Sequence, residues 1–145
     1  MAAALVMYGN APHNAFNGDI NWDGAGNLKM ALLTAYTPSE DHDTFTAAVA
    51  AGTEHAAANG YSTGGVALGT VTHTYATGVS TFGSASVVWT ATGALTAKYA
   101  VCYDVASDKA IFYINLDGAA GNVTATDAAF TITDATGWFS IDVSP

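Results

Sequence analysis

The sequence predicts an all-β domain, on three observations. Threonine, valine and aromatic residues are frequent, glycines interrupt the chain at short intervals, and apolar positions rarely recur at helical spacing. With 145 residues, the chain is expected to form one domain, because this length buries roughly 70% of its unfolded surface around a single core. Half of the residues are hydrophobic and only 10% are charged, which excludes a disordered chain of low hydrophobicity and high charge.

The N-terminal part of the chain contains one clear strand. Residues 1–14 are a candidate N-terminal arm, and residues 13–20 offer one helical turn with Phe16 and Ile20 on one side, although Asn17 and Gly18 weaken it. The apolar run 28–34 predicts a strand, which the turn residues 23–27 precede.

One short helix is predicted from Ser39 to about Ala51. Apolar residues recur there at helical spacing, and Gly52 supplies a stop signal. The expected N-cap is Thr37 or Ser39. Residues 56–83 are rich in Gly, Thr, Ser and Ala and are expected to be mostly loop or edge structure.

Short strands are predicted through the rest of the chain. Residues 87–90 form one, and 95–104 alternate apolar and polar residues as a half-buried strand does. A hairpin loop at 105–109 leads to 110–116, which is apolar on both faces and therefore expected to be covered on both sides. Three further strands follow as a meander, with Gly137 available for a positive φ between the last two: 123–125, 129–133 and 138–143.

The charge balance excludes several partners. The formal net charge is −9, with three lysines, Lys29, Lys98 and Lys109, and no arginine. Nucleic acid and anionic membranes both require clustered basic residues, so neither is an expected partner. No apolar run approaches the roughly 20 residues of a membrane-spanning helix, and residues 1–7 lack the features of a signal peptide, which leads us to expect a soluble protein made in a cytoplasm.

An acidic cluster is the first candidate site. Glu40, Asp41, His42 and Asp43 could ligate a divalent ion, but their spacing matches neither a zinc site nor a calcium loop. The favoured interpretation is structural: the acids stand at the start of the predicted helix, where the helix dipole stabilises them.

No other motif predicts catalysis or cofactor binding, so we expect no catalytic, cofactor or metal residues. The loop 60–65 lacks the lysine of a phosphate-binding loop, and the single Cys102 is expected to pack in the core. The four histidines, His13, His42, His55 and His73, share no motif. Any two of the acids could in principle stand at the spacing of a glycosidase pair.

The three tryptophans, Trp22, Trp89 and Trp138, could form a sugar-stacking platform, although Trp89 and Trp138 look like core anchors.

Three segments, in this order, carry a resemblance to a known family. They are "NLKMALLTAYTPSEDHD" within 20–45, "GYSTGGVALG" at 60–69 and "VVWTATGALTAKYAVCYDV" at 87–105, followed by "AIFYINLDG" and "GWFSIDV". Together they resemble a family of small structural proteins of tailed bacteriophages. Lys98 stands where the family more often has arginine, and lysine cannot make the bidentate contacts of arginine.

The resemblance implies a non-enzymatic virion component without cofactors. Its most direct form is a capsid decoration (cement) protein, an antiparallel β-sandwich of jelly-roll type with one short helix, assembled in the host cytoplasm. As a homotrimer it would bind the major capsid protein on the outside of the head. The expected contact surfaces are the loop 60–65 and the arm 2–14. The alternatives are a tail, neck or baseplate component and a carbohydrate-binding module, with an enzyme the least favoured.

Overall fold

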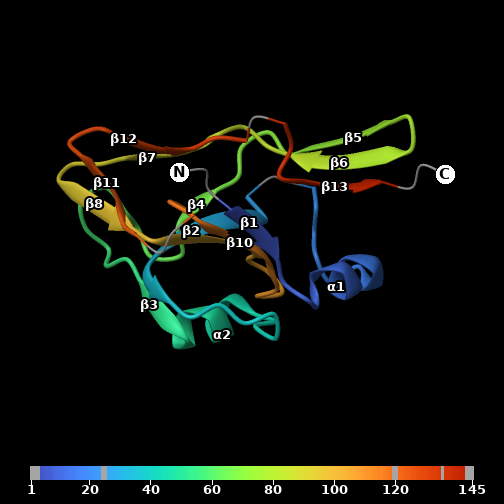
Figure 1. Cartoon of the computed structure of the whole chain (residues 1–145), viewed down its shortest axis with the longest axis horizontal. Helices are drawn as coiled ribbons and strands as arrows, with labels where there is room; N and C mark the ends of the chain where they lie inside the picture. Colours follow the sequence, from blue (N-terminus) through green and yellow to red (C-terminus); the bar gives the residue numbers. More distant parts are fainter. Residues whose placement is uncertain (1–3, 24–25, 119–120, 135, 143–145) are drawn as a thin grey trace.

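The computed structural model describes residues 4–23, 26–118, 121–134 and 136–142. They form an all-β sandwich of antiparallel strands with two helices, α1 (Ala11–Asn17) and α2 (Phe45–Ala50) (Figure 1). The predicted all-β class and sandwich are confirmed. The jelly-roll type is not confirmed by the strand pairing and stays a prediction.

The main sheet contains six strands. Its order is β1 (Ala4–Met7), β10 (Ala110–Asn115), β9 (Tyr99–Asp104), β2 (Leu28–Tyr36) and β3 (Gly52–Glu54), with β4 (Val66–Ala67) also paired to β2. Its two central strands, β2 and β9, come from the first and third resembling segments respectively and pair from Leu28 opposite Asp104 to Leu33 opposite Tyr99.

The second half of the chain is one long, interrupted antiparallel hairpin whose tip is the turn 105–109. Nearest the tip, β9 pairs with β10 in the main sheet. Farther out, β8 (Ala94–Ala97) pairs with β11 (Val123–Thr126), β7 (Val87–Thr90) with β12 (Ala129–Ile132), and β6 (Val79–Gly83) with β13 (Phe139–Asp142). The expected C-terminal meander is therefore wrong, because β11, β12 and β13 each pair with an earlier strand and not with one another.

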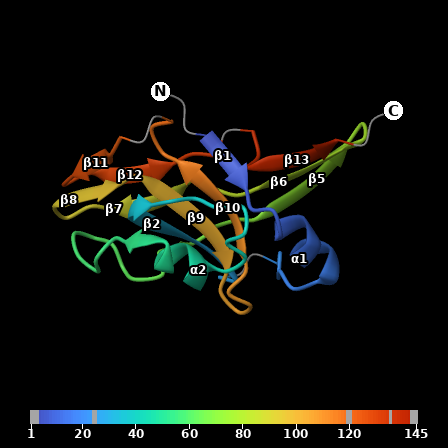
Figure 2. The ribbon, with the colours of Figure 1, turned by 60° about the horizontal axis from the view of Figure 1, so that its bottom comes forward.

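A hairpin completes the second layer. Strand β5 (Thr72–Ala76) pairs with β6, so that β13, β6 and β5 form a three-stranded sheet. The turn residues Thr77 and Gly78 both have positive φ, as a type I′ turn requires. This hairpin lies in a region expected to be mostly loop or edge structure, and β5 is indeed an edge strand. Figures 1 and 2 show the long hairpin's outer strands on one side of the main sheet and α2 on the other.

The main core lies between the two layers. Strand β9 contributes to it on one face and is covered on its other face as well, so the expectation of a half-buried strand is wrong. All six residues of β9 are buried, although the alternation of 95–104 predicts a half-buried strand. On one face the side chains of Ala100 and Cys102 point toward the second layer, where the rings of Phe112 and Trp138 lie 5.7 Å apart. On the other face Tyr103 stacks on Phe45 of α2 at 3.9 Å. The predicted strand is also interrupted at Lys98, which separates β8, paired with β11, from β9 in the main sheet.

The helices differ from the prediction in number and in bounds. The residue that caps α2 is Thr44, whose Oγ1 accepts a hydrogen bond from the backbone N–H of Ala47 at 3.0 Å, so neither Thr37 nor Ser39 is the cap. The second helix, α1, ends in a Schellman motif, in which Gly18 is left-handed and Asp19 donates to the carbonyl of Asn14. The pair Asn17 and Gly18 therefore ends this helix and does not prevent it.

Residues 4–14 do not form a free arm. Strand β1 pairs with β10 over four residues, and Tyr8, Ala11 and Asn14 are buried against the domain. Residues 1–3 of the expected arm lie outside the described residues. Exposed residues remain along this segment, among them Val6, Pro12 and His13, so its role as a contact surface stays a prediction.

Candidate functional site

A groove of about 620 Å³ opens between α1 and the three-stranded sheet. Figure 2 shows these elements together at one end of the molecule. Residues of α1 form one wall and residues of β5, β6 and β13 the other, while Met7 and Ile111 of the main sheet reach its floor. The volume is in the range of pockets that bind small ligands or side chains of a partner.

The register of the three strands explains the groove's chemistry. Directly paired residues point to the same face of a sheet, which places His73, Phe82 and Phe139 in one row and Tyr75, Ser80 and Ile141 in the next. The first row is covered by Trp22, whose ring lies 5.1 Å from Phe82 and 6.0 Å from His73. The second row is open to solvent.

Three large apolar side chains border the open part of the groove. Phe16 of α1 is 84% exposed, Tyr75 is 71% exposed and Ile141 is 50% exposed. We call these three residues the rim. Clustered exposed apolar side chains of this size mark an interaction surface more often than a free surface. The groove can therefore bind apolar groups, and His73 is placed there with its Nε2 3.4 Å from the carbonyl of Trp22.

The rim was not predicted as a site. From the sequence, Phe16 was expected on one side of a helical turn and the three tryptophans were a possible platform, but neither Tyr75 nor Ile141 was a candidate. One local signal was available: alternating residues on both sides of Thr77 and Gly78 are typical of a hairpin. Of the three tryptophans, Trp89 and Trp138 are buried as predicted, and Trp22 is partly buried under the groove.

The acidic cluster does not form a ligand set. Within the part of the chain that the structure describes, no group of three His, Cys, Asp or Glu side chains could hold a metal ion. Glu40 and Asp41 are exposed, and His42 shares a hydrogen bond with Tyr36, whose hydroxyl lies 2.7 Å from its Nδ1. None of the cluster's acids lies in the first turn of α2, which begins only at Phe45, so their expected place at the helix start is wrong.

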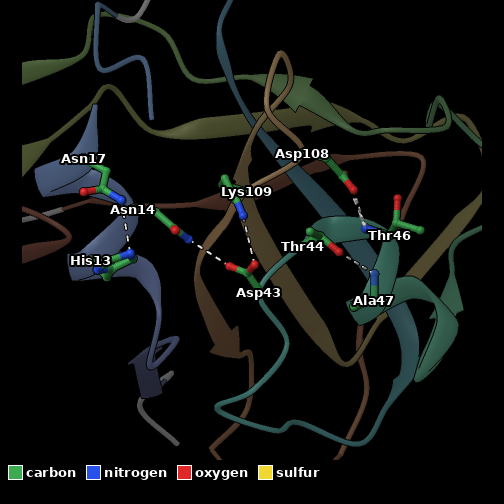
Figure 3. A network of polar contacts seen from close by, with 9 residues as sticks. All are labelled: His13, Asn14, Asn17, Asp43, Thr44, Thr46, Ala47, Asp108 and Lys109. Carbon is green, nitrogen blue, oxygen red and sulfur yellow. Dashed lines mark hydrogen bonds and ion pairs between the residues drawn. The ribbon is translucent and has the colours of Figure 1, made fainter. Parts of the chain in front are cut away.

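Asp43 instead connects three segments (Figure 3). Its carboxylate accepts hydrogen bonds from Lys109 Nζ and from Asn14 Nδ2, both at 2.9 Å. The bond from Lys109, followed by that from Asn14, lowers the pKa of Asp43 below its ordinary value of 3.8. At the N-terminus of α2 the acid is Asp108, whose two carboxylate oxygens lie 3.3 Å from the backbone nitrogen of Thr46. This acid is supplied by the β9–β10 turn and not by the preceding chain.

A cluster of tyrosines surrounds the buried hydroxyl of Tyr36. The Tyr36 hydroxyl lies 2.8 Å from that of Tyr8, and the Tyr36 ring meets those of Tyr99 and Tyr113 edge-on. Desolvation by burial is the main cause that raises the pKa of Tyr8, Tyr36 and Tyr113. Tyr8 directly follows β1, Tyr36 ends β2 and Tyr113 lies in β10, so the cluster connects these three strands.

The loop 60–65 is firmly held at its ends. Glu54 Oε1 accepts hydrogen bonds from the Tyr61 hydroxyl and the backbone N–H of Gly64, both at 2.6 Å, and the Tyr61 hydroxyl accepts one from the N–H of Leu32. Gly65 has a φ of 75° and packs directly on the carbonyl oxygen of Met30. Within the loop, Gly60, Ser62 and Thr63 are exposed and can serve as a contact surface, whereas Tyr61 is buried.

The remaining candidates are separate from one another. Cys102 is fully buried, and burial raises the pKa of its thiol, as expected for a packed residue. Each histidine has a different set of neighbours: His13 contacts Asn17, His42 contacts Tyr36, His55 contacts the carbonyl of Ala56, and His73 contacts Trp22.

Comparison of the chain with family models, with curated proteins and with solved structures finds no match. Neither of the two helices that the structure describes is long and apolar enough to cross a membrane.

Proposed function

We propose that this protein is a structural component of a tailed-phage virion, and that it decorates the capsid by binding the outer surface of the major capsid protein lattice. It acts there as a homo-oligomer that stabilises the head, without a cofactor or a catalytic step. The sequence resemblance supplies the function, and the arrangement of the resembling segments in space supports it.

One observation carries the proposal: the three resembling segments, far apart in the chain, meet at the centre of the fold. Strands β2 and β9 pair along six residues, and the loop 60–65 attaches to β2 through Tyr61 and Gly65. Residues that form one structural unit are expected to recur together in relatives that share the fold. The resemblance therefore rests on residues that pack together as one structural unit.

Two physical properties fit a position outside the head. A net charge of −9 repels packaged nucleic acid, which is itself strongly negative. The rim and the groove supply an apolar surface for contact with another protein.

Quantitative mass spectrometry of purified virions tests the proposal. A decoration protein is expected in a fixed, high ratio to the major capsid protein, on the order of hundreds of copies in a head built from repeated subunits. A few copies per particle, as in a ring, would move the protein to the tail, neck or baseplate, and immunogold labelling would then locate it. Absence from washed virions would contradict a structural role.

A carbohydrate-binding module is the second candidate, favoured by Tyr75. This ring is 71% exposed beside Trp22 and His73, and exposed aromatic rings stack on sugars. A glycan array compares the native chain with Tyr75→Ala, and Val88→Ala, an exposed residue of β7, serves as a control. Sugar binding that Tyr75→Ala abolishes and Val88→Ala preserves would support this candidate, whereas no binding by the native chain would remove it.

A further inference from the structure

Strand β5 is an open edge of the three-stranded sheet. Among the described residues it pairs only with β6, and all five of its residues are exposed. In a two-residue hairpin the residues flanking the turn, here Ala76 and Val79, exchange hydrogen bonds, and bonded pairs alternate from there. The backbone N–H and C=O groups of His73 and Tyr75 therefore point away from β6, toward the free edge.

This edge lacks the devices that normally prevent strands from joining. It contains no lysine, proline or acidic residue, and its pairing with β6 shows no bulge. The whole segment from His55 to Ala97 is without a charged side chain, although the chain carries twelve acids and three lysines elsewhere. Two copies of a protein with a net charge of −9 repel each other, and this repulsion is weakest where the contacting strand carries no charged side chain of its own.

We propose that β5 pairs antiparallel with β5 of a second copy, across a twofold axis at Thr74. In this register His73 lies opposite Tyr75 of the other copy, and these two pairs use all the outward-pointing backbone groups of both residues in four hydrogen bonds. The two three-stranded sheets then form one continuous six-stranded sheet.

The side chains fit this register as well. His73 and Tyr75 lie on the groove face, so each His73 ring adjoins the Tyr75 ring of the other copy, and aromatic pairs of this kind stabilise antiparallel strands. The pairing covers part of the exposed Tyr75 ring, which is one of the three rim residues. An isologous contact of this type closes after two copies. It therefore gives a dimer, which differs from the trimer that the family resemblance implies, and it does not depend on the proposed function.

Sedimentation equilibrium or light scattering of the full chain tests the pairing. We expect a mass twice the monomer mass of 14.7 kDa. Thr74→Lys places two ammonium groups opposite each other at the axis and should weaken the dimer by about tenfold or more in Kd. Thr131→Lys is the matched control, because Thr131 is also an exposed threonine in a strand but lies on β12. It should leave the dimer intact.

The salt dependence has a definite sign. Because the two copies repel through their net charge and the interface holds no ion pair, added salt should screen the repulsion and lower the Kd of the native dimer. An interface built on ion pairs would show the opposite dependence.

Cross-linking checks the register itself. Thr74→Cys brings two thiols together at a non-hydrogen-bonded pair, where Cα atoms are about 4.5 Å apart and a disulfide can form. Cys102 is buried, so only the new thiol is accessible in the folded chain. We expect a covalent dimer from Thr74→Cys under mild oxidation and none from Thr131→Cys. A monomeric native chain, a trimer unaffected by Thr74→Lys, or equal cross-linking of the two variants would each overturn the proposal.

Discussion

The ammonium group of Lys109 lies 2.9 Å from the carboxylate of Asp43, and this ion pair joins the β9–β10 turn to the segment that precedes α2. The side chains are 24% and 39% exposed, so water screens part of the attraction. A buried Asn14 donates to the same carboxylate and attaches α1 to this corner (Figure 3).

Removal of this ion pair should destabilise the fold modestly and in a pH-dependent way. For exposed pairs the coupling free energy in a double-mutant cycle of Asp43→Asn and Lys109→Met is expected below about 1 kcal/mol. The folded state lowers the pKa of Asp43 from 3.8, so its contribution is present above that pH and is lost as the pH falls through the folded-state pKa. Urea unfolding of the native chain, the two single variants and the double variant, at neutral and at acid pH, measures this coupling free energy. A coupling that persisted after the carboxylate had been protonated would contradict the assignment.

Loss of the α2 cap should cost more than a change next to it. Thr44→Ala removes the acceptor for the N–H of Ala47, and such changes cost about 1 kcal/mol of unfolding free energy. Thr46→Ala, at an exposed position within α2, is the control and should be close to neutral because alanine favours helices. Chemical denaturation compares the two, and equal effects would argue against Thr44 as the cap.

Alanine substitutions at two left-handed glycines distinguish the cost of backbone strain from the cost of a steric clash. Gly18 and Gly65 have φ values of 78° and 75°, but only at Gly65 would a Cβ atom meet the backbone, at the carbonyl of Met30. Gly18→Ala should cost about 1 kcal/mol through strain alone. Gly65→Ala adds a clash in a packed site and should cost about 3 kcal/mol in total. Similar thermal unfolding midpoints for the two variants would contradict the observed packing of the loop 60–65.

The buried tyrosine hydroxyls predict that the fold loses stability at alkaline pH. Burial is the largest cause that raises the pKa of Tyr103 to about 12, and it raises those of Tyr8 and Tyr61 still further. Groups with a raised folded-state pKa stabilise the fold fully below their unfolded value of about 10, and this stabilisation is lost as the pH rises above it. We expect the ultraviolet titration to show several of the seven tyrosines ionising only together with unfolding, as followed by circular dichroism. Ionisation of all seven near pH 10 in the folded chain would contradict the buried cluster.

Part of the candidate site was accessible from sequence, and the larger part was not. Local signals placed Phe16 on one side of a helical turn, but the hairpin around Thr77 and Gly78 was not predicted, because residues 56–83 were expected to be mostly loop or edge structure. The groove itself needs Trp22, Phe82 and Phe139, which come from three distant segments and meet only through strand pairing. No local pattern states which strands pair, because the same alternation of residues suits many partners.

The sequence by itself determined the all-β class, the positions of β2, β7 and β10, the burial of β10 on both faces and the strongly negative charge. These properties follow from alternation and composition, which act over a few neighbouring residues. Only the tertiary structure decided that the C-terminal strands pair with earlier ones, that β9 is buried on both faces, and that Asp43 bonds to Lys109 while Asp108 lies at the start of α2. These outcomes depend on how two layers cover each other's apolar faces, and that requirement applies to the whole chain at once.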